Sequence, residues 1–402
     1  MKILFVLPQI PYPPHSGGRI VTWNTLKRFA QVAEVSVACL YHSPAELDAL
    51  SHVKDLCEEC VAFPAHGKWA LSPLVKSLGS SWPYKAHRFY NAQMGGYVRR
   101  MWARHRFDVI HAQNFYTTPY ITGSEPCLKV HYKENIEGNL LLRLSQASSN
   151  PLVKCAAWLE GIRTRHFEAR ACRKFDQILT ISPIDREHLL RLNPALPVQH
   201  QRPGVDLEIY PFLEEIPGPP RVVFTGTMSY YPNADGVRDF LRTSWPLIKF
   251  KVPEAECHIV GANPPRTIQR LHGKDDVYIP GRVADIAEYL EKATVYIVPL
   301  RIGGGIRLKI LEAMATGRAM VSTSIGCEGL DVHHQEHLLV QNDPIRFADA
   351  VVQLLKDREQ REYLRRNART RVEDLYDWDQ VIKHQWQQYC SLSDRLPSLS
   401  RV

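Results

Sequence analysis

The first part of the chain alternates short apolar runs with longer stretches of helical periodicity. Residues 2–7 and 34–40 are mostly apolar, and residues 18–31 between them place apolar side chains at every third or fourth position. The short runs are typical of parallel strands covered on both faces, and the longer pattern predicts an amphipathic helix. Further buried strands are expected at residues 107–111, 128–131 and 177–182. The pattern therefore predicts a strand–helix–strand unit that continues into a parallel sheet.

A proline-rich stretch, residues 193–220, interrupts this rhythm. Proline removes a backbone donor and does not continue a helix or a central strand, so we place a domain boundary there. A second series of apolar runs predicts strands at residues 221–226, 256–261, 277–279, 295–299 and 319–323. Helices are expected afterwards at residues 344–357, 358–372 and 377–389.

Together the two series predict an α/β architecture. At 402 residues the chain exceeds the usual size of a single core, which favours two domains. We expect two Rossmann-like, doubly wound parallel-sheet domains that face a cleft, followed by C-terminal helices. The predicted domains are residues 1–202 and 203–376, with residues 377–402 as a helix and tail that pack back on the first domain.

The composition narrows the class of protein. Hydrophobic residues make up 45% of the chain and charged residues 23%, as in folded globular proteins. No apolar stretch approaches the roughly 20 residues that cross a bilayer, and the apolar run after Lys2 ends at Pro8, so we interpret it as a strand and not as a signal peptide. The nine cysteines show no repeated spacing, which fits a reducing cytoplasm. Cys57 and Cys60 form a single CxxC, and metal or redox use is the less favoured interpretation because a zinc site needs further ligands.

The net charge of +8 has a strong local contribution from residues 68–106, which contain Lys and Arg but no Asp or Glu. Aromatic residues are interleaved with these charges, a mixture that suits an anionic membrane surface or a lipid-linked diphosphate. A nucleic-acid face would look similar, as would a solvated pair of basic helices whose aromatic rings belong to the core. We expect a peripheral contact of residues 68–106 with an anionic membrane and no nucleic-acid partner.

Two loops that follow expected strands are rich in glycine. In open α/β sheets, ligands bind outside the carboxyl ends of the strands. Residues 8–18 deliver Gly17 and Gly18 to the start of a helix, where bare amides can meet a phosphate, although the same glycines also suit a simple turn. The loop does not read GxGxxG, which argues against a nicotinamide site.

The second loop, residues 300–307, contains three consecutive glycines before an expected helix that starts near Ile306. Gly304 and Gly305 let the backbone approach a diphosphate closely, and the helix adds the positive end of its dipole. This loop is the strongest candidate for an anion site in the chain.

Charged residues follow this loop on the expected helix. Arg307 and Lys309 supply positive charge for a phosphate, and Glu312 is placed to accept hydrogen bonds from the two hydroxyls of a ribose. A surface glutamate paired with Arg307 or Lys309 is the alternative interpretation of Glu312.

Residues 299–317 resemble the donor-binding signature of glycosyltransferase family four, the group 1 glycosyltransferases, in which a Pro-terminated strand leads through glycines to Leu-Glu-Ala-Met-Ala-x-Gly. Further segments that resemble this family are residues 134–137, 203–206 with Tyr210, 224–227 and 281–283. Within the family, the Arg-x-Lys-Ile-Leu-Glu variant is most similar to the exopolysaccharide-associated sugar transferases.

The resemblance implies the GT-B fold and a retaining transferase of the hexosyltransferase type. It implies transfer of a sugar from a nucleotide-diphospho-sugar, bound by the second domain, to a glycan or polyprenyl-diphosphate-linked acceptor, bound by the first. Neither a metal nor a further cofactor is expected, and the work would be done in the cytoplasm at the inner face of the membrane. The donor-binding residues that we expect are Gly17, Gly18, Gly226, Thr227, Gly304, Gly305, Ile306, Arg307, Lys309 and Glu312.

The chain departs from the family pattern at two donor positions. The first glutamate of the Glu-x7-Glu signature falls on Gly304, while the second falls on Glu312. The basic residue that usually follows the glycine of the second-domain loop is absent after Gly226. We therefore expect Arg307 together with Lys309 to carry the charge that balances the phosphate.

In the first domain, the family pattern Asp-Val-Ile-His-x-His is matched by residues 108–113, with His111 and with Gln113 in place of the second histidine. His111 is the expected catalytic residue, although a histidine at the end of a strand is often structural. Gln113 and Asn135 are the expected contacts to the sugar or acceptor.

A metal-binding DxD motif is matched only by residues 377–379, beyond both series of strands, where it is expected to cap the last helix. The missing glutamate at Gly304 keeps a non-catalytic nucleotide-sugar-binding subunit open as an alternative. A GT-B-fold epimerase or phosphorylase is the other alternative.

Overall fold

The computed structural model describes residues 1–67, 70–148 and 150–395. The chain forms two compact units. Unit 1 comprises Met1–Arg202 together with the chain from Asp379 onward, and unit 2 comprises Pro203–Trp378. Each unit is described by itself below.

Unit 1 is built on a seven-stranded sheet in which all neighbouring strands are parallel, in the order β3-β2-β1-β4-β5-β6-β7. Its strands are β1 (Lys2–Leu7), β2 (Glu34–Tyr41), β3 (Glu59–Pro64), β4 (Val109–Gln113), β5 (Leu128–Lys133), β6 (Gln177–Thr180) and β7 (Val198–His200). The expected strands of the first series are all present. The proline-rich stretch differs from the expectation because it contains β7, a three-residue strand at the edge of the sheet, where proline is tolerated.

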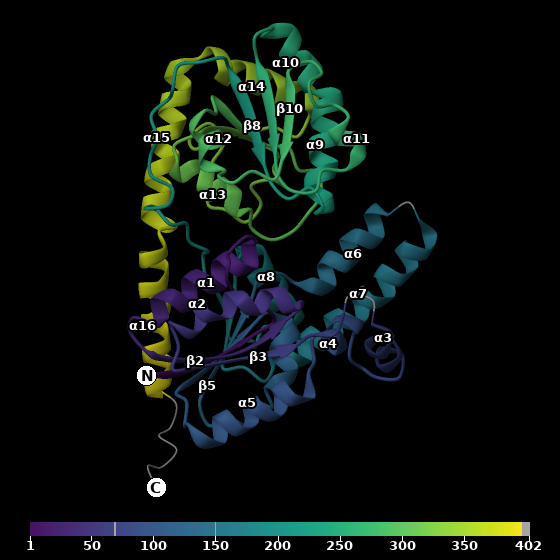
Figure 1. The fold of residues 1–402 in the computed structure, drawn as a ribbon, viewed down its shortest axis with the longest axis vertical. Coiled ribbons are helices and arrows are strands. Elements are labelled where there is room, and N and C mark those ends of the chain that lie inside the picture. Colours follow the sequence, from purple (N-terminus) through teal and green to yellow (C-terminus); the bar gives the residue numbers. More distant parts are fainter. Residues whose placement is uncertain (68–69, 149, 396–402) are drawn as a thin grey trace. The chain divides into compact units, whose positions relative to one another are not determined.

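Helices cover both faces of this sheet (Figure 1). They are α1 (Gly17–Phe29), α2 (Leu50–Lys54), α3 (Leu71–Leu78), α4 (Tyr84–Arg88), α5 (Ala92–Arg104), α6 (Glu137–Ala147), α7 (Pro151–Cys172), α8 (Pro183–Leu192) and α16 (Trp378–Arg395), with short 3-10 helices η1 (Pro44–Ala49) and η2 (Phe115–Tyr120). Leu4 and Val6 of β1 share a core with Met94 and Val98 of α5. Because side chains alternate along a strand, Phe5 faces the opposite side, where its ring packs against Phe29 of α1. The same alternation along β4 places its side chains in turn against the layer of α5 and the layer of α1.

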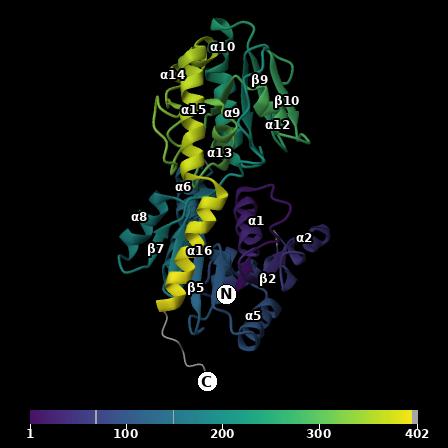
Figure 2. The ribbon, with the colours of Figure 1, turned by 90° about the vertical axis from the view of Figure 1, so that its left-hand side faces the viewer.

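The last helix, α16, begins at the end of unit 2 and then runs along unit 1 (Figure 2). The ring of Tyr389 stacks on Phe29, and the backbone oxygen of Val381 accepts a hydrogen bond from Gln201. The helix continues to Arg395, six residues beyond the expected end at Tyr389. It therefore forms part of the layer that faces Phe5 and β4.

Unit 2 is built on a six-stranded parallel sheet in the order β10-β9-β8-β11-β12-β13. Its strands are β8 (Arg221–Thr225), β9 (Glu256–Val260), β10 (Val277–Gly281), β11 (Val295–Val298), β12 (Ala319–Ser322) and β13 (Leu339–Val340). Its helices are α9 (Tyr231–Thr243), α10 (Trp245–Lys251), α11 (Arg266–Gln269), α12 (Ala287–Glu291), α13 (Leu308–Ala315), α14 (Pro344–Lys356) and α15 (Arg358–Leu375).

Both sheets reverse their strand order at one place. In unit 1 the reversal lies between β1 and β4, and in unit 2 it lies between β8 and β11. Helices on opposite faces diverge at such a reversal, so the carboxyl ends of these two strands are where a doubly wound sheet binds its ligand. Among the described helices of the chain, none is long and apolar enough to span a membrane.

Candidate functional site

The glycine loop, residues 300–307, leaves β11 at the reversal point of unit 2. Gly303 and Gly305 have φ angles of 146° and 74°, which L side chains rarely adopt. A Cβ atom on Gly303 would also collide with the guanidinium of Arg307. The glycines are thus required by the path of the backbone. The helix after the loop starts at Leu308 with Arg307 as its N-cap residue, two residues after Ile306.

Arg307 folds back over the loop instead of pointing out of it. Its side chain is 7% exposed, and its Nη1 atom donates to the backbone oxygens of Gly304 and Gly305, the latter at 2.7 Å. In a trans peptide, the N–H points opposite to the C=O of the same unit. The amides of Gly305 and Ile306 therefore point away from Arg307, which leaves them directed outward for an anion. In this structure Arg307 braces the loop through Nη1, and the expected contact of its charge with a phosphate stays a prediction.

Arg301 of the loop pairs with Asp235 and Asp239, and Lys309, on the helix that follows, is the next cation near the loop. Its Nζ atom lies 3.1 Å from Oδ1 of Asn233 and 4.1 Å from the centre of the Phe224 ring. The pKa of Lys309 is lowered to about 7, chiefly by burial and also by the positive charge of Arg307, while the carboxylate of Glu312 opposes both effects. The negative charge of a bound anion would stabilise the ammonium form and so offset the loss of its solvation. The ammonium group is consequently held in a place that favours a negatively charged ligand.

Glu312 lies one turn further along α13 and is half-buried. Burial raises the pKa of Glu312, and both the ammonium of Lys309 and a hydrogen bond from the hydroxyl of Tyr210 lower it. Tyr210 comes from the segment before β8, and burial together with Glu312 raises its own pKa. Glu312 is therefore a partly enclosed acceptor fixed from one side, and not a glutamate on the helix surface.

The loop after β8 forms the other wall of this group. Gly226 approaches Gly261 so closely that a Cβ atom on Gly261 would collide with the Gly226 carbonyl, and the Nζ atom of Lys309 lies against the place where Gly226 would carry a Cβ. Asn233, in the first turn of α9, donates to the backbone oxygen of Thr227 at 2.8 Å. The structure thus brings Gly226 and Thr227 together with Lys309, as expected.

Unit 1 carries a chain of hydrogen bonds at its own reversal point. His111 of β4 is fully buried, its ring stacks on Phe5, and it lies on the sheet face that α16 covers. Its Nδ1 atom is 2.7 Å from the hydroxyl of Tyr389, and its Nε2 atom is 3.0 Å from Oε1 of Gln113. Gln113 in turn donates to Oε1 of Glu134 at 2.9 Å.

The direction of this chain follows from the partners at its ends. Oε1 of Gln113 can only accept, so the proton of His111 lies on Nε2, and Nδ1 accepts from the hydroxyl of Tyr389. That hydroxyl accepts from Nε2 of Gln385 at 3.0 Å. Burial lowers the pKa of His111 to about 4, so the ring is neutral at ordinary pH. These hydrogen bonds fix the orientation of the Gln113 amide, which donates to Glu134.

Glu134 is the residue of this group that reaches the loop end of the sheet. It is half-buried, and burial raises its pKa while the amide of Gln113 lowers it. Its carboxylate lies against Gly18 at the start of α1, where a Cβ atom would collide with both carboxylate oxygens. Gly18 therefore faces a carboxylate of its own chain, Gly17 is the first residue of the same helix, and Asn135 follows Glu134 in the loop after β5.

Several expectations change in this light. The ring of His111 has no exposed surface, so the structure places it behind Gln113 and Glu134 and not where it can contact a substrate. Sequence reasoning missed Glu134, Asn233 and Tyr210 as members of these groups. Glu134 could have been found because it directly follows a buried strand at the loop edge of the sheet.

The two remaining motifs have structural settings. In the DxD match, Asp379 lies in the first turn of α16, and its Oδ1 atom pairs with Nε of Arg28 at 2.6 Å. In the CxxC match, both cysteines are free thiols. Within the described residues, no group of three or more His, Cys, Asp and Glu side chains gathers as a metal cluster.

Solved structures with two such sheets define the fold of the chain. The chain matches sucrose-phosphate synthase from Thermosynechococcus elongatus with a TM-score of 0.72 and 18% identity, over 98% of this chain and 99% of that one. It matches Anabaena HepE in complex with UDP-glucose with a TM-score of 0.66 and 15% identity, over 97% of this chain and 100% of that one. The fold is GT-B, as predicted.

The family model of glycosyl transferases group 1 matches residues 219–357, so unit 2 contains a group 1 glycosyltransferase domain. The chain is also 20% identical over 400 residues to an uncharacterized 44.6 kDa protein in the cps region of Klebsiella pneumoniae, with 95% of this chain and 98% of that protein covered. The family match confirms the prediction of a group 1 glycosyltransferase for this part of the chain.

Proposed function

We propose that the chain is a metal-independent, retaining glycosyltransferase that transfers a sugar from a nucleotide-diphospho-sugar to a glycan or lipid-linked acceptor in the synthesis of a polysaccharide. The observation that carries the proposal is the group formed by the glycine loop, Lys309 and Glu312 at the reversal point of unit 2. It offers backbone amides and one cation next to a carboxylate, and these match the phosphates and the ribose of such a donor.

The departing nucleoside diphosphate sets the chemical requirement. Negative charge grows on its phosphate as the glycosidic bond breaks, and fixed dipoles and cations lower the barrier where that charge develops. The outward amides of Gly305 and Ile306 and the ammonium of Lys309 supply this stabilisation in the proposal. Because Lys309 loses part of its solvation in the free protein, a bound phosphate restores its charged form.

Glu312 is proposed to hold the nucleoside. Its carboxylate accepts hydrogen bonds, and the hydroxyl of Tyr210 already fixes its orientation. Because the Glu312 carboxylate is already held in one orientation, it loses little conformational freedom when a ribose diol binds. The complex of Anabaena HepE with UDP-glucose supports a sugar nucleotide as the donor.

The acceptor is proposed to meet unit 1 at the loop edge near Glu134, Asn135 and Gly18. The carboxylate of Glu134, oriented by Gln113, is placed there to accept a hydrogen bond from a sugar hydroxyl. The relative in a cps region supports a polysaccharide as the setting, and the proposed place of action is the cytoplasmic face of the membrane.

A direct test uses purified full-length protein with UDP-, GDP- and ADP-sugars. A thermal-shift screen finds the nucleotide, because a ligand that binds only the folded state raises the melting temperature. Nuclear magnetic resonance then follows product formation with a glycan acceptor, with and without a chelator. Transfer with an unchanged anomeric configuration in chelator supports the proposal, and an inverted product or a strict need for a divalent metal contradicts it.

A matched pair of variants locates the donor site. Glu312→Gln removes the carboxylate but keeps its shape, and we expect a large loss of transfer. Glu254→Gln changes an exposed glutamate of the same unit and serves as the control. Equal activity of the two variants would remove Glu312 from the site.

The substitution of the family glutamate by Gly304 favours one further candidate, a nucleotide-sugar-binding subunit without turnover. Binding of a sugar nucleotide without transfer, hydrolysis or epimerisation would select that candidate. Formation of an epimer, or of a sugar phosphate from added phosphate, would instead select an epimerase or a phosphorylase.

A further inference from the structure

Helices α3, α6 and α7 of unit 1 carry large apolar side chains that face solvent. The exposed fractions reach 74% for Leu71 and 78% for Leu78 on α3, and 80% for Leu152 on α7. Further exposed apolar residues on these helices are Leu74, Val75, Leu144, Val153, Trp158 and Leu159. Contiguous exposed apolar surface on a folded protein marks a contact with a membrane or with another protein.

The orientation of α3 is the reverse of that of an ordinary surface helix. Its leucines and valine point outward, while Pro73 and Ser77 are its buried residues. The hydroxyl of Ser77 bonds to the backbone oxygen of Leu74 at 2.9 Å, and the backbone oxygen of Ser77 accepts from Arg163 of α7. Of the residues of α3, only Pro73 and Ser77 are buried against the protein, and the four large apolar side chains all face outward.

Helices α6 and α7 form a hairpin that projects from the sheet of unit 1 (Figure 1). Among the first ten residues of α7, only Ala157 is buried. Two helices alone cannot cover apolar side chains that point away from both of them. The outer half of α7 thus leaves its apolar side chains uncovered.

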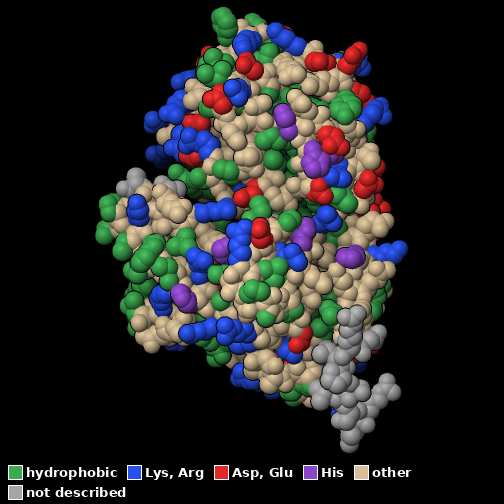
Figure 3. All heavy atoms as spheres, turned by 180° about the vertical axis from the view of Figure 1, so that it is seen from behind, with side chains coloured by type: hydrophobic (Ala, Val, Ile, Leu, Met, Phe, Trp, Pro, Cys, Tyr) green, Lys and Arg blue, Asp and Glu red, His purple; other side chains and the backbone are tan. Residues whose placement is uncertain are grey.

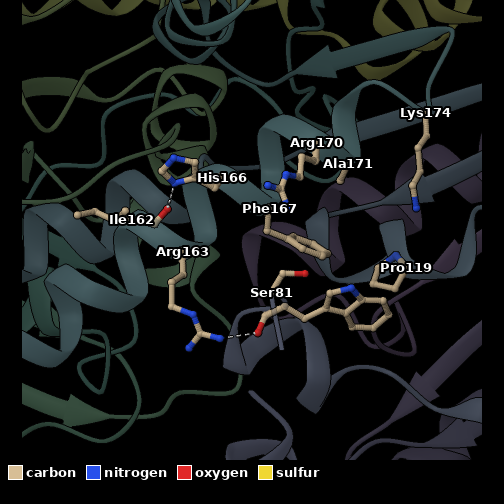
Figure 4. Close-up of a pocket in the computed structure, with 10 residues that line it drawn as sticks. Ser81, Pro119, Ile162, Arg163, His166, Phe167, Arg170, Ala171 and Lys174 are labelled. Carbon is tan, nitrogen blue, oxygen red and sulfur yellow. Dashed lines mark hydrogen bonds between the residues drawn. The ribbon is translucent and has the colours of Figure 1, made fainter. Parts of the chain in front are cut away.

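The same side of α7 changes from apolar to basic along its length. Leu152, Leu159, His166 and Arg170 recur at intervals of seven, seven and four residues, which place them along one stripe of the helix. At the basic end the stripe borders a hollow of about 350 Å³ between α7 and the segment of Ser81 and Trp82 (Figure 4). Its basic lining residues are Arg163, Arg170 and Lys174, His166 lies beside them, and the lining includes no Asp or Glu.

The hollow is held in shape by the residues that line it. Nη2 of Arg163 donates to the backbone oxygens of Ser80 at 3.0 Å and Trp82 at 2.9 Å. Nζ of Lys174 donates to the backbone oxygen of Ile121 at 3.0 Å. Figure 3 shows apolar side chains and Lys and Arg side chains together on the surface of this lobe, at the left of the view.

We propose that α3 and the α6–α7 hairpin form a docking face for a bilayer that contains anionic phospholipids, with the apolar side chains in the interface and the basic hollow at the level of the headgroup phosphates. Leu159 and His166 are seven residues apart on α7, or about 10 Å along the helix axis. With the N-terminal end of α7 inserted first, Leu152 and Leu159 lie deepest, and His166 and Arg170, further along the same stripe, lie near the headgroup phosphates. The charges match because the basic end of the stripe would meet a negative surface.

This face replaces most of the surface expected from residues 68–106. The rings of Phe89, Tyr90, Tyr97 and Trp102 pack against the core of unit 1. Lys68 and Trp69 lie outside the described residues. Among the described residues of that segment, the large exposed apolar side chains all lie on α3. The hairpin residues come from a part of the sequence whose charge is less lopsided. The inference rests on this surface and not on the donor chemistry of unit 2.

Vesicle binding of the full chain tests the proposal. Sedimentation with phosphatidylcholine vesicles that contain 0 or about 30% phosphatidylglycerol should give binding only to the anionic set, with weaker binding at high salt. Trp158 lies on the proposed face, so its fluorescence should shift to the blue on binding, and Trp158→Phe should remove that change.

Three variants separate the proposed face from general stickiness. Leu152→Ser with Leu159→Ser should weaken vesicle binding at least tenfold, because burial of two leucines is lost. Arg170→Gln should weaken it about fivefold, because one cation near an anionic surface contributes about that factor. Phe250→Ser, on the exposed helix α10 of unit 2, is the matched control and should bind as the unchanged chain does. Thermal unfolding checks that each variant remains folded.

Other results overturn the proposal. Equal binding of all variants places the contact elsewhere, and equal binding to neutral vesicles removes the role of the basic hollow. A dimer of the unchanged chain that Leu152→Ser with Leu159→Ser dissociates identifies the occupant as a second copy. Inorganic phosphate that protects the protein from heat, without any vesicle binding, identifies the hollow as a site for a free anion.

Discussion

The two reversal points of the molecule hold their polar groups in different ways. In unit 2, the glycine loop is braced by Arg307, which bonds to carbonyls two and three residues away. In unit 1, the oriented chain joins Gln385 and Tyr389 of α16 to His111, Gln113 and Glu134, so it depends on segments more than 270 residues apart. One arrangement is local in sequence and the other requires the complete fold.

The difference also concerns charge. Lys309 and Glu312 keep two ionisable groups near each other in unit 2, and the pKa of Lys309 lies close to neutral pH. The interior of the chain in unit 1 is neutral, because His111 accepts and donates without a charge. We expect unit 2 to respond to substitution through binding and turnover, and unit 1 to respond mainly through stability.

The largest expected effect is on turnover in unit 2. Lys309→Met keeps the apolar stem but removes the charge, and we expect kcat/KM to fall by about 10² to 10³ because a donor to the developing negative charge is lost. Lys274→Met, at an exposed lysine of the same unit, is the control. Steady-state assays of nucleoside diphosphate release measure the effect. An unchanged rate would show that Lys309 is structural and would erase the contrast between the units.

Acid should act on unit 1 through His111. The pKa of His111 is about 4 in the fold and about 6.5 in the unfolded chain, so the unfolded state binds more protons between these values. The neutral ring therefore contributes roughly 3 kcal/mol of stability above pH 6.5, which is lost as the pH falls toward 4. Urea unfolding followed by tryptophan fluorescence should show this slope, and His111→Gln should flatten it. The same slope in both proteins would contradict the buried neutral state.

The affinity for the donor should depend on pH above pH 7, and not in the acid range. Lys309 has a pKa of about 7 in the free protein, and a bound diphosphate favours its charged form. The Kd of an intact sugar nucleotide should stay constant below pH 7 and rise up to tenfold per pH unit above it, because binding then requires proton uptake. Calorimetry at several pH values measures this, with Lys309→Met as the variant that should lose the dependence. A Kd that falls with rising pH would reverse the assignment.

The smallest effect is expected at Tyr389, which joins Gln385 to His111 in the series of hydrogen bonds of unit 1. Tyr389→Phe keeps the ring that stacks on Phe29 but removes the hydroxyl between Gln385 and His111. We expect a loss of about 1 kcal/mol in the free energy of unfolding, the usual net value of a hydrogen bond. Donor binding by unit 2 should not change. A large loss of donor affinity would show that the two regions are coupled.

The part of the site that sequence could predict is the local part. Alternating apolar runs and glycines define the strands, the sheet class and the loop that precedes Lys309 and Glu312, because these depend on neighbouring residues. The direction of the Arg307 side chain could not be predicted, because the same residue can point outward or brace its own loop. The position of His111 behind Gln113 depends on α16, and no local pattern near residue 111 contains that information.

The return of α16 to unit 1 has a consequence for synthesis of the chain. Nascent domains generally fold as units from the N-terminus as they leave the ribosome. The sheet of unit 1 is encoded by residue 200, but the ring that covers Phe29 and fixes His111 belongs to Tyr389. The sheet of unit 1 is therefore synthesised first, but its cover by α16 is synthesised last. A chain whose translation stops before α16 would expose the apolar face around Phe29.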